Sequence, residues 1–185
     1  MNSEVFDLLI SYLLLVLLFS GFNPAMIKYS AFAVLTAFLF HELAHRFVAR
    51  GYGYRAFYRR WDTGMLMALL IAVATKLLTG STLIFAALGA VQIYAPYDYN
   101  IEETFGKIAL AGPLTNVLLG ATFLLYVRFV SYSPLLAMAA SINLWLAFFN
   151  LLPFPPLDGS KVVRWNAGIW ALAIGISYVL YRLLM

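Results

Sequence analysis

Residues 24–49 read PAMIKYSAFAVLTAFLFHELAHRFVA, and this stretch decides the class of fold. It is apolar for most of its length, and a helix needs only about 20 apolar residues to cross the hydrocarbon core of a bilayer. Asn23 followed by Pro24 is a typical helix start, because Asn caps the first turn and Pro fits the first helical position. We therefore expect a membrane-spanning helix over these residues. Three ionisable side chains interrupt its apolar run: His41, Glu42 and His45.

The composition of the whole chain also indicates a membrane protein. Of its 185 residues, 64% are hydrophobic and 11% are charged, whereas about a quarter of the residues in a soluble domain are charged. An ordinary globule with a water-facing surface is thereby excluded. The length predicts one polytopic domain over residues 1–185 and no soluble regulatory domain. The basic residues lie beside apolar runs, which is typical of topology signals at lipid headgroups, so nucleic acid is not an expected partner.

Further apolar runs predict the other crossings, over residues 8–22, 108–127, 135–157 and 165–181. Residues 64–97 leave two alternatives, because the uncharged segment 81–95 is short for a span and contains Gly89. It forms either a helical crossing paired with residues 64–80, or a re-entrant hairpin or short strand. The expected fold is an all-α membrane protein with about six transmembrane helices, with the re-entrant or strand segment between residues 64 and 97 as the alternative.

The positions of basic residues predict the orientation of the chain. If the helix that ends at Ala49 ends in the cytoplasm, eight basic residues lie on that side and three lie outside, as the positive-inside rule requires. The cytoplasmic group is Arg46, Arg50, Arg55, Arg59, Arg60, Lys107, Lys161 and Arg164, and the outer group is Lys28, Arg128 and Arg182. The same orientation brings Asp158 to the membrane face where His45 lies.

Residues 41–45 form an H-E-x-x-H motif on the predicted helix. The i, i+4 spacing puts His41 and His45 on one face, within reach of a single metal ion, and leaves Glu42 free to act as a base on water. Ionisable groups inside a spanning helix are costly, and a divalent cation offers them a partner. Both histidines of the chain belong to this motif.

A catalytic zinc ion needs three protein ligands and one open position. The chain has no cysteine, and both histidines are already used, so the third ligand must be a carboxylate next to an apolar segment. Asp158 fits best, because it follows a helix-breaking run of three prolines that is tolerated in a membrane only beside protein or a wet cavity. An ordinary helix end with Asp158 as a solvated cap is the alternative.

Three motifs together make the chain resemble the site-2 protease family of intramembrane zinc metalloproteases. His41–His45 resembles the family's H-E-x-x-H, residues 111–116 (AGPLTN) resemble its A-G-P-x-x-N, and residues 150–159 (NLLPFPPLDG) resemble its N-x-x-P-x-P-x-L-D-G. The motifs occur in the family's order. The one departure at the third motif is Ser160-Lys161, which stands where many members have another small residue.

The resemblance implies one Zn²⁺ ion held by His41, His45 and Asp158, with Glu42 as the catalytic acid and base. It also implies Asn116 as a catalytic group that contacts the substrate backbone or the oxyanion, and Asn150 as a substrate-binding group. From the residues alone, an intramembrane asparagine such as Asn116 is as readily explained by a hydrogen bond between helices.

The sequence thus predicts a zinc endopeptidase that cleaves in or near transmembrane helices of membrane proteins. The expected partners are a transmembrane protein substrate and membrane lipid, in a multi-pass protein of the cell membrane whose active site lies nearer the cytoplasmic face; the oligomeric state stays open. The alternative is a non-catalytic metal-binding membrane protein, and Glu42, which is not a ligand, argues against it. A di-iron oxygenase would need more histidine or carboxylate ligands than the chain has.

Overall fold

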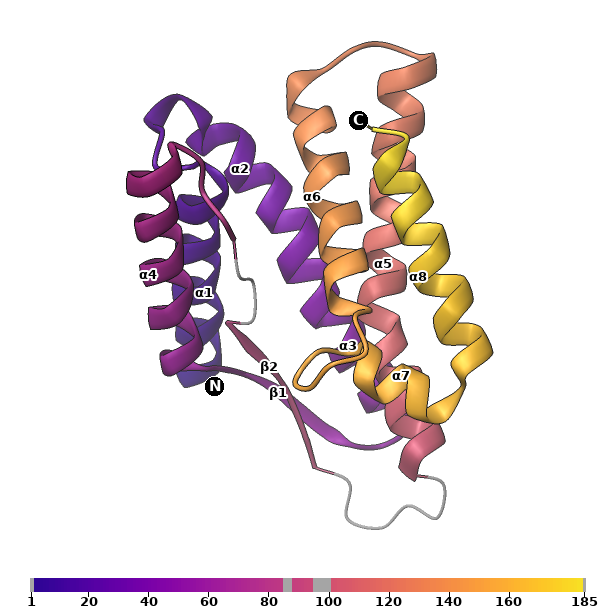
Figure 1. Cartoon of the computed structure of the whole chain (residues 1–185). Helices are drawn as coiled ribbons and strands as arrows, with labels where there is room; N and C mark the ends of the chain where they lie inside the picture. Colours follow the sequence, from indigo (N-terminus) through magenta and orange to yellow (C-terminus); the bar gives the residue numbers. More distant parts are fainter. Residues whose placement is uncertain (1, 85–87, 95–100, 185) are drawn as a thin grey trace.

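The computed structural model describes residues 2–84, 88–94 and 101–184, which form a bundle of long helices with a small sheet near one end (Figure 1). The helices are α1 (Asn2–Phe19), α2 (Ile27–Val34), α3 (Phe40–Gly51), α4 (Asp62–Thr79), α5 (Ile101–Phe129), α6 (Pro134–Asn150), α7 (Gly159–Trp165) and α8 (Ala167–Arg182). A 3₁₀ turn, η1 (Pro24–Met26), precedes α2, and a π segment, η2 (Leu35–Leu39), joins α2 to α3. The strands are β1 (Arg55–Arg60) and β2 (Gly89–Tyr94).

The predicted helix over residues 24–49 is confirmed as one rod from Pro24 to Gly51. Asn23 caps it, because its Oδ1 accepts a hydrogen bond of 3.0 Å from the Ala25 N–H. The π segment η2 interrupts the rod and ends at Leu39, so that one residue, Phe40, separates it from His41. Such segments are rare and frequently occur at functional sites, so this one marks the stretch that leads into the motif.

Three helices of the described chain are long and apolar enough to cross a membrane: Pro24–Gly51, Asp62–Thr79 and Ile101–Phe129. The apolar helices α6 and α8 are shorter. The mainly helical membrane fold is therefore confirmed, while the number of about six crossings stays a prediction.

The two strands form an antiparallel sheet in which Arg55 pairs with Tyr94 and Arg60 pairs with Gly89. A strand between residues 64 and 97 is thus confirmed at Gly89–Tyr94, and the alternative of a helical crossing over residues 81–95 is wrong. The fold is correspondingly not all-α. Strand β1 has no clear signal in the sequence, because its arginines and aromatic residues look like an interfacial loop until β2 supplies the pairing partner.

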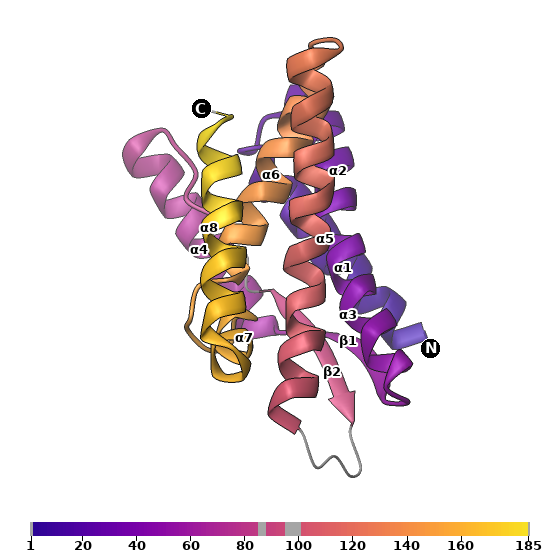
Figure 2. The same ribbon diagram turned by 90° about the vertical axis from the view of Figure 1, so that its right-hand side faces the viewer.

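Helices α5 and α6 pack at close range in the centre of the bundle (Figure 2). A Cβ atom at Gly120 of α5 would lie 2.6 Å from Leu144 Cγ of α6, so only glycine fits there. Small side chains of this kind let helix backbones approach in membranes, where water does not drive association. Large apolar side chains such as Leu118 and Phe129 point outward instead, as expected for a lipid-facing surface.

Helix α6 ends at Asn150, although the apolar run predicted a helix as far as residue 157. The three prolines of the following segment, Pro153, Pro155 and Pro156, explain the early end, because Pro cannot donate to the helical ladder. The segment turns back to start α7 at Gly159, and α7 packs against α5 (Figure 2). A Cβ atom at Gly159 would collide with the Leu151 carbonyl, so the return depends on this glycine.

Candidate metal centre

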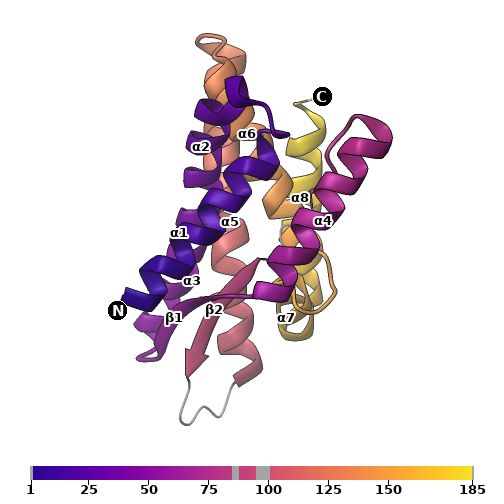
Figure 3. The same ribbon diagram turned by 90° about the vertical axis from the view of Figure 1, so that its left-hand side faces the viewer.

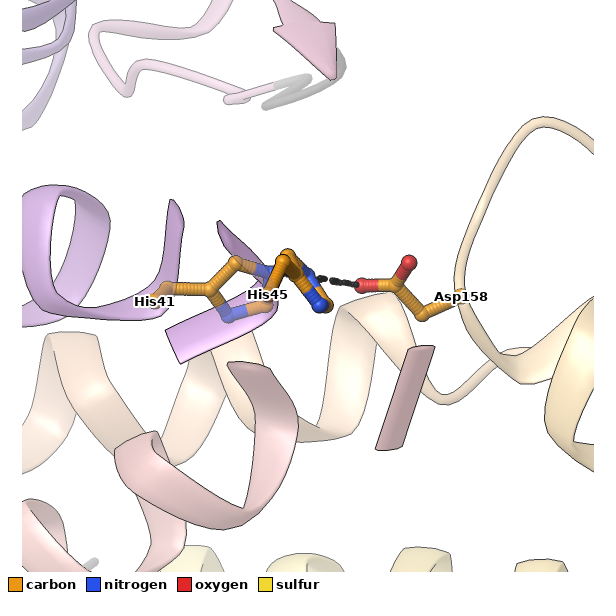
Figure 4. Close-up of side chains that lie close together, drawn as sticks. All are labelled: His41, His45 and Asp158. Carbon is orange, nitrogen blue, oxygen red and sulfur yellow. Dashed lines mark hydrogen bonds and ion pairs between the residues drawn. The ribbon is translucent and has the colours of Figure 1, made fainter. Parts of the chain in front are cut away.

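Helix α3 presents His41 and His45 on one face, one helical turn apart (Figure 4). Both imidazoles are buried, and their ring centroids lie 4.5 Å apart at an interplanar angle of 86°. Asp158, just before α7, points at the pair from the opposite side. The structure thus joins residues that are more than a hundred positions apart in the sequence, as the motifs predicted.

The distances among the three side chains suit one small cation. His41 Nε2 lies 3.2 Å and His45 Nε2 lies 3.1 Å from Asp158 Oδ2, and the two Nε2 atoms are 2.9 Å apart. Four-coordinate zinc with bonds of about 2.0–2.1 Å holds its ligand atoms roughly 3.3 Å apart. Two imidazole nitrogens and one carboxylate oxygen also match the three-ligand set of a catalytic zinc site. The residues present therefore fit a zinc ion.

Other groups fix the orientation of these candidate ligands. His45 Nδ1 lies 2.7 Å from the Ile108 carbonyl of α5, so it donates there and leaves Nε2 as a ligand atom. Lys161 Nζ lies 3.5 Å from Asp158 Oδ1, which leaves Oδ2 directed at the imidazoles. Such supporting contacts are typical of metal sites, because they hold a ligand in the geometry it needs before the ion binds.

Gly112 of α5 provides the space for the two imidazoles. A Cβ atom there would lie 2.5 Å from His45 Nε2 and 2.6 Å from His41 Nε2. The A-G-P motif thus has a steric role at the centre, since any larger residue would occupy the place of the candidate ligand atoms.

The charge of Asp158 is stabilised by its surroundings. Burial by itself opposes ionisation, but the neighbouring imidazoles of His45 and His41 and the ammonium of Lys161 hold the pKa of the Asp158 carboxyl well below its ordinary value. This carboxylate is consequently ionised at neutral pH, as a metal ligand must be.

Glu42 lies in the same cavity without joining the three candidate ligands. Its side chain is buried, it accepts a hydrogen bond from the Val91 N–H of β2, and its Oε2 has no partner within the described part of the chain. The cavity has a volume of about 330 Å³, enough for a few residues of an extended peptide. Its lining includes both histidines, Glu42, Asp158 and residues 88–93.

The two asparagines singled out by the motifs lie in different places. Asn150 lines the cavity, and its Nδ2 donates to the Leu146 carbonyl at 3.1 Å. Asn116 is fully buried and is not among the described residues that line the cavity; its Nδ2 donates to the Ala37 carbonyl of η2 at 2.9 Å. The Asn116 side chain also lies near the His41 imidazole. A direct contact of either asparagine with substrate stays a prediction.

The sequence alone did not identify three neighbours of the centre: Val91, Lys161 as a partner of Asp158, and Gly112 as a steric partner of the histidines. The contact of Val91 follows from strand pairing that no local pattern encodes. The tight site around Gly112 has a signal in the sequence, which is the glycine of the second motif.

Comparison with known proteins identifies the family. The family model described as Peptidase family M50 matches residues 129–172, which include Asp158. The zinc metalloprotease MJ0611 of Methanocaldococcus jannaschii is 43% identical over 188 residues, which cover 98% of this chain and 94% of that protein. The zinc metalloprotease YwhC of Bacillus subtilis is 28% identical, with 76% and 69% of the two chains covered.

Matches to longer relatives cover only part of those proteins. The zinc metalloprotease Rip3 of Mycobacterium tuberculosis is 33% identical over 81% of this chain and 34% of its own length. No solved structure matches the chain significantly. The match to MJ0611 along nearly the whole of both chains, joined to the three motifs and the zinc-compatible cluster, places this chain in the site-2 protease family of M50 zinc metalloproteases.

Proposed function

We propose that the protein is an intramembrane endopeptidase that hydrolyses peptide bonds in or near transmembrane helices of membrane-protein substrates. The observation that carries this proposal is the buried cavity in which Glu42 lies beside His41, His45 and Asp158 at the level of the spanning helices. A peptidase of soluble substrates would have no need to enclose its reacting groups within apolar helices.

The three side chains His41, His45 and Asp158 would hold one zinc ion. Bound there, zinc would polarise the scissile carbonyl and lower the pKa of a water molecule. Glu42 accepts the proton of the attacking water and passes it to the leaving amine, because its free oxygen faces the cavity and its other contact, the Val91 N–H, holds the carboxylate in place. Asn150, which lines the cavity, contacts the substrate backbone in this proposal.

Strand β2 supports binding of an extended substrate. In an antiparallel pair, backbone groups point alternately toward and away from the partner strand. Tyr58 and Val91 face each other, and their N–H groups bond outward to Glu4 and Glu42, so alternate residues of β2 turn their polar groups away from β1 and toward the cavity. An unwound substrate segment could add to this edge as a further strand.

The decisive experiment separates metal binding from catalysis. Glu42→Gln should keep one zinc ion per chain and lose cleavage of a model transmembrane substrate by at least about a hundredfold, because the general base is removed and the ligands stay. His41→Ala, His45→Ala and Asp158→Ala should each lose zinc. Zinc is measured by elemental analysis of the purified protein, and cleavage is measured in detergent micelles.

Glu103→Gln is the matched control, because the same chemical change is made on an exposed side chain of α5. It should retain both zinc and cleavage. A Glu42→Gln protein as active as wild type would remove Glu42 from the mechanism. A wild-type protein that binds zinc and cleaves no transmembrane substrate would support the alternative of a non-catalytic metal-binding protein.

A further inference from the structure

A second cavity, of about 470 Å³, lies at the end of the bundle where α1 begins and α3 ends (Figure 3). Its lining is strongly basic, with Arg46 and Arg50 from α3 and Arg55 and Arg59 from β1. Glu4 is the acidic residue of this lining. The remaining lining residues are Ser3, Tyr54, Ala56 and Phe57.

The single acidic group in this cavity is already neutralised. Glu4 Oε1 accepts a hydrogen bond from the Tyr58 N–H at 3.1 Å and forms an ion pair with Arg46 Nη1 at 3.1 Å. Arg59 has a more distant partner, with its Nη1 3.5 Å from Asp7 Oδ2. These contacts hold the arginines in place and leave a net positive charge in the cavity.

Unused hydrogen-bond donors accompany this charge. Arg46 Nε is buried and has no partner among the described residues, which normally carries a cost in stability. Arg50 and Arg55 are exposed, and neither forms an ion pair with any residue in the described ranges. Guanidinium groups bind phosphate oxygens through pairs of parallel N–H donors. The cavity therefore offers charge and donors suited to a phosphate group.

The surroundings of the cavity favour a lipid over a free phosphate ion. It lies at the terminus of the spanning rod Pro24–Gly51, where headgroups are found. Apolar side chains adjacent in sequence to its lining residues are exposed: Val5 by 65%, Phe6 by 56% and Phe47 by 80%. They offer an acyl chain an apolar surface near the cavity, whereas a soluble anion would make no use of it.

We propose that this cavity binds the phosphate of an anionic phospholipid, with Arg46, Arg50, Arg55 and Arg59 as its recognition residues. Clusters of basic residues beside a spanning helix commonly bind anionic headgroups. The site is separate from the three candidate zinc ligands, so the proposal does not depend on proteolytic activity.

The test uses the purified full chain in neutral detergent, with dioctanoyl phosphatidylglycerol and dioctanoyl phosphatidylcholine as probes and native mass spectrometry as the readout. Wild type should bind phosphatidylglycerol about tenfold more tightly than phosphatidylcholine. Arg50→Gln combined with Arg55→Gln should weaken phosphatidylglycerol binding by about tenfold or more, because two contributors to headgroup binding are lost.

The matched control combines Lys107→Gln in α5 with Arg164→Gln in α7, which removes the same charge from residues that do not line the cavity. Its affinity should stay within about twofold of wild type. Equal weakening by both double variants would overturn the proposal, as would equal binding of the two lipids. Displacement of the lipid by inorganic phosphate at similar concentration would overturn the choice of a lipid.

Should the double Gln variant fail to fold, as judged by its thermal transition, Arg55→Gln alone decides the matter. Its side chain is exposed on β1, so loss of folding is not expected. Phosphatidylglycerol binding should fall by about threefold. An unchanged affinity would overturn the proposal.

Discussion

At the scale of single residues, substitution of Gly112 is the most direct test of the geometry of the metal centre. Gly112→Ala would place a Cβ atom 2.5 Å from His45 Nε2 and 2.6 Å from His41 Nε2, so the imidazoles must shift. We expect zinc affinity to fall by about tenfold to a hundredfold, the range seen when contacts that orient metal ligands are lost. Competition with a zinc chelator measures the affinity.

Gly175→Ala is the control for this change. Gly175 lies inside α8, and a Cβ atom there would have no neighbour within 4 Å. Alanine should be tolerated there or slightly stabilise the helix. If Gly112→Ala binds zinc as tightly as Gly175→Ala does, the close fit around the histidines has no bearing on metal binding.

Substitution of Asn116 tests whether this residue supports η2 and His41 or contacts the oxyanion. Its Nδ2 is engaged with the Ala37 carbonyl, and its side chain lies near the His41 imidazole. Asn116→Leu should therefore lower zinc occupancy and kcat together, by several-fold, because η2 and the His41 ring lose their support. Retained zinc with a lower kcat would instead favour the predicted contact with the oxyanion.

Asn143→Leu serves as the comparison for Asn116. Asn143 is equally buried and also bonds to η2, with its Nδ2 donating to Thr36 Oγ1 at 3.0 Å. It has no contact with His41 among the described residues, so its replacement should reduce thermal stability and spare zinc binding at moderate temperature.

The residues of the zinc cluster could be predicted because their signal is local. His41 and His45 follow from helical periodicity, and Asp158 follows because few carboxylates lie beside apolar runs. The pairing of Val91 with Glu42 and of Glu4 with Arg46 could not be predicted in this way. Each depends on tertiary contacts between segments that have no common pattern in the sequence.

At the scale of elements, the role proposed for strand β2 requires that a helical substrate unwind before cleavage. A helical substrate keeps its carbonyls in i to i−4 hydrogen bonds, so the scissile segment must unwind before it can pair with β2 or reach Glu42. Replacing a Gly near the scissile bond by Leu should slow cleavage by roughly fivefold, because the helix becomes more stable. Binding should change little.

Cleavage rates and binding constants of a matched pair of model substrates, one with Gly and one with Leu at the same position, test this requirement. Equal rates would indicate that unwinding does not limit the reaction. In that case β2 would have no role in holding an extended substrate, and the proposal that the protein hydrolyses peptide bonds would be unaffected.

The elements themselves were predicted unevenly. The centres of the long apolar helices lie within a few residues of the centres of the predicted runs, since length and hydropathy define such helices. The end of α6 and the strand β1 were missed, the first because three prolines outweigh an apolar run, and the second because a strand needs its partner. The π segment has no signature in the sequence.

At the scale of the whole molecule, the arrangement of helix ends predicts the topology. The end of α3 and the helix α7 lie at one end of the bundle, and the connection between α5 and α6 lies at the other (Figure 1). Single cysteines in place of Tyr52 and Arg164 should both react with an impermeant thiol reagent from the cytoplasmic side. A cysteine in place of Tyr132 should react from the opposite side.

The absence of native cysteine makes this labelling simple to interpret. Tyr52 and Tyr132 are 44% and 74% exposed, so each position is open to a reagent. If Tyr52 and Arg164 were labelled from different sides, the histidines and Asp158 could not share one ion.

The π segment before His41 has a consequence for how the gene can change. A π segment closes its hydrogen bonds from i to i+5 and so holds one residue more than an α-helix would; deleting one residue of Leu35–Leu39 would therefore return this stretch to a regular α-helix. Asn116 and Asn143 hold the segment itself, while Asp158 and Ile108 hold the histidines that follow. Deleting a residue would thus displace the groups that Asn116 and Asn143 contact, whereas a substitution that keeps the length of the segment leaves the path of the backbone unchanged.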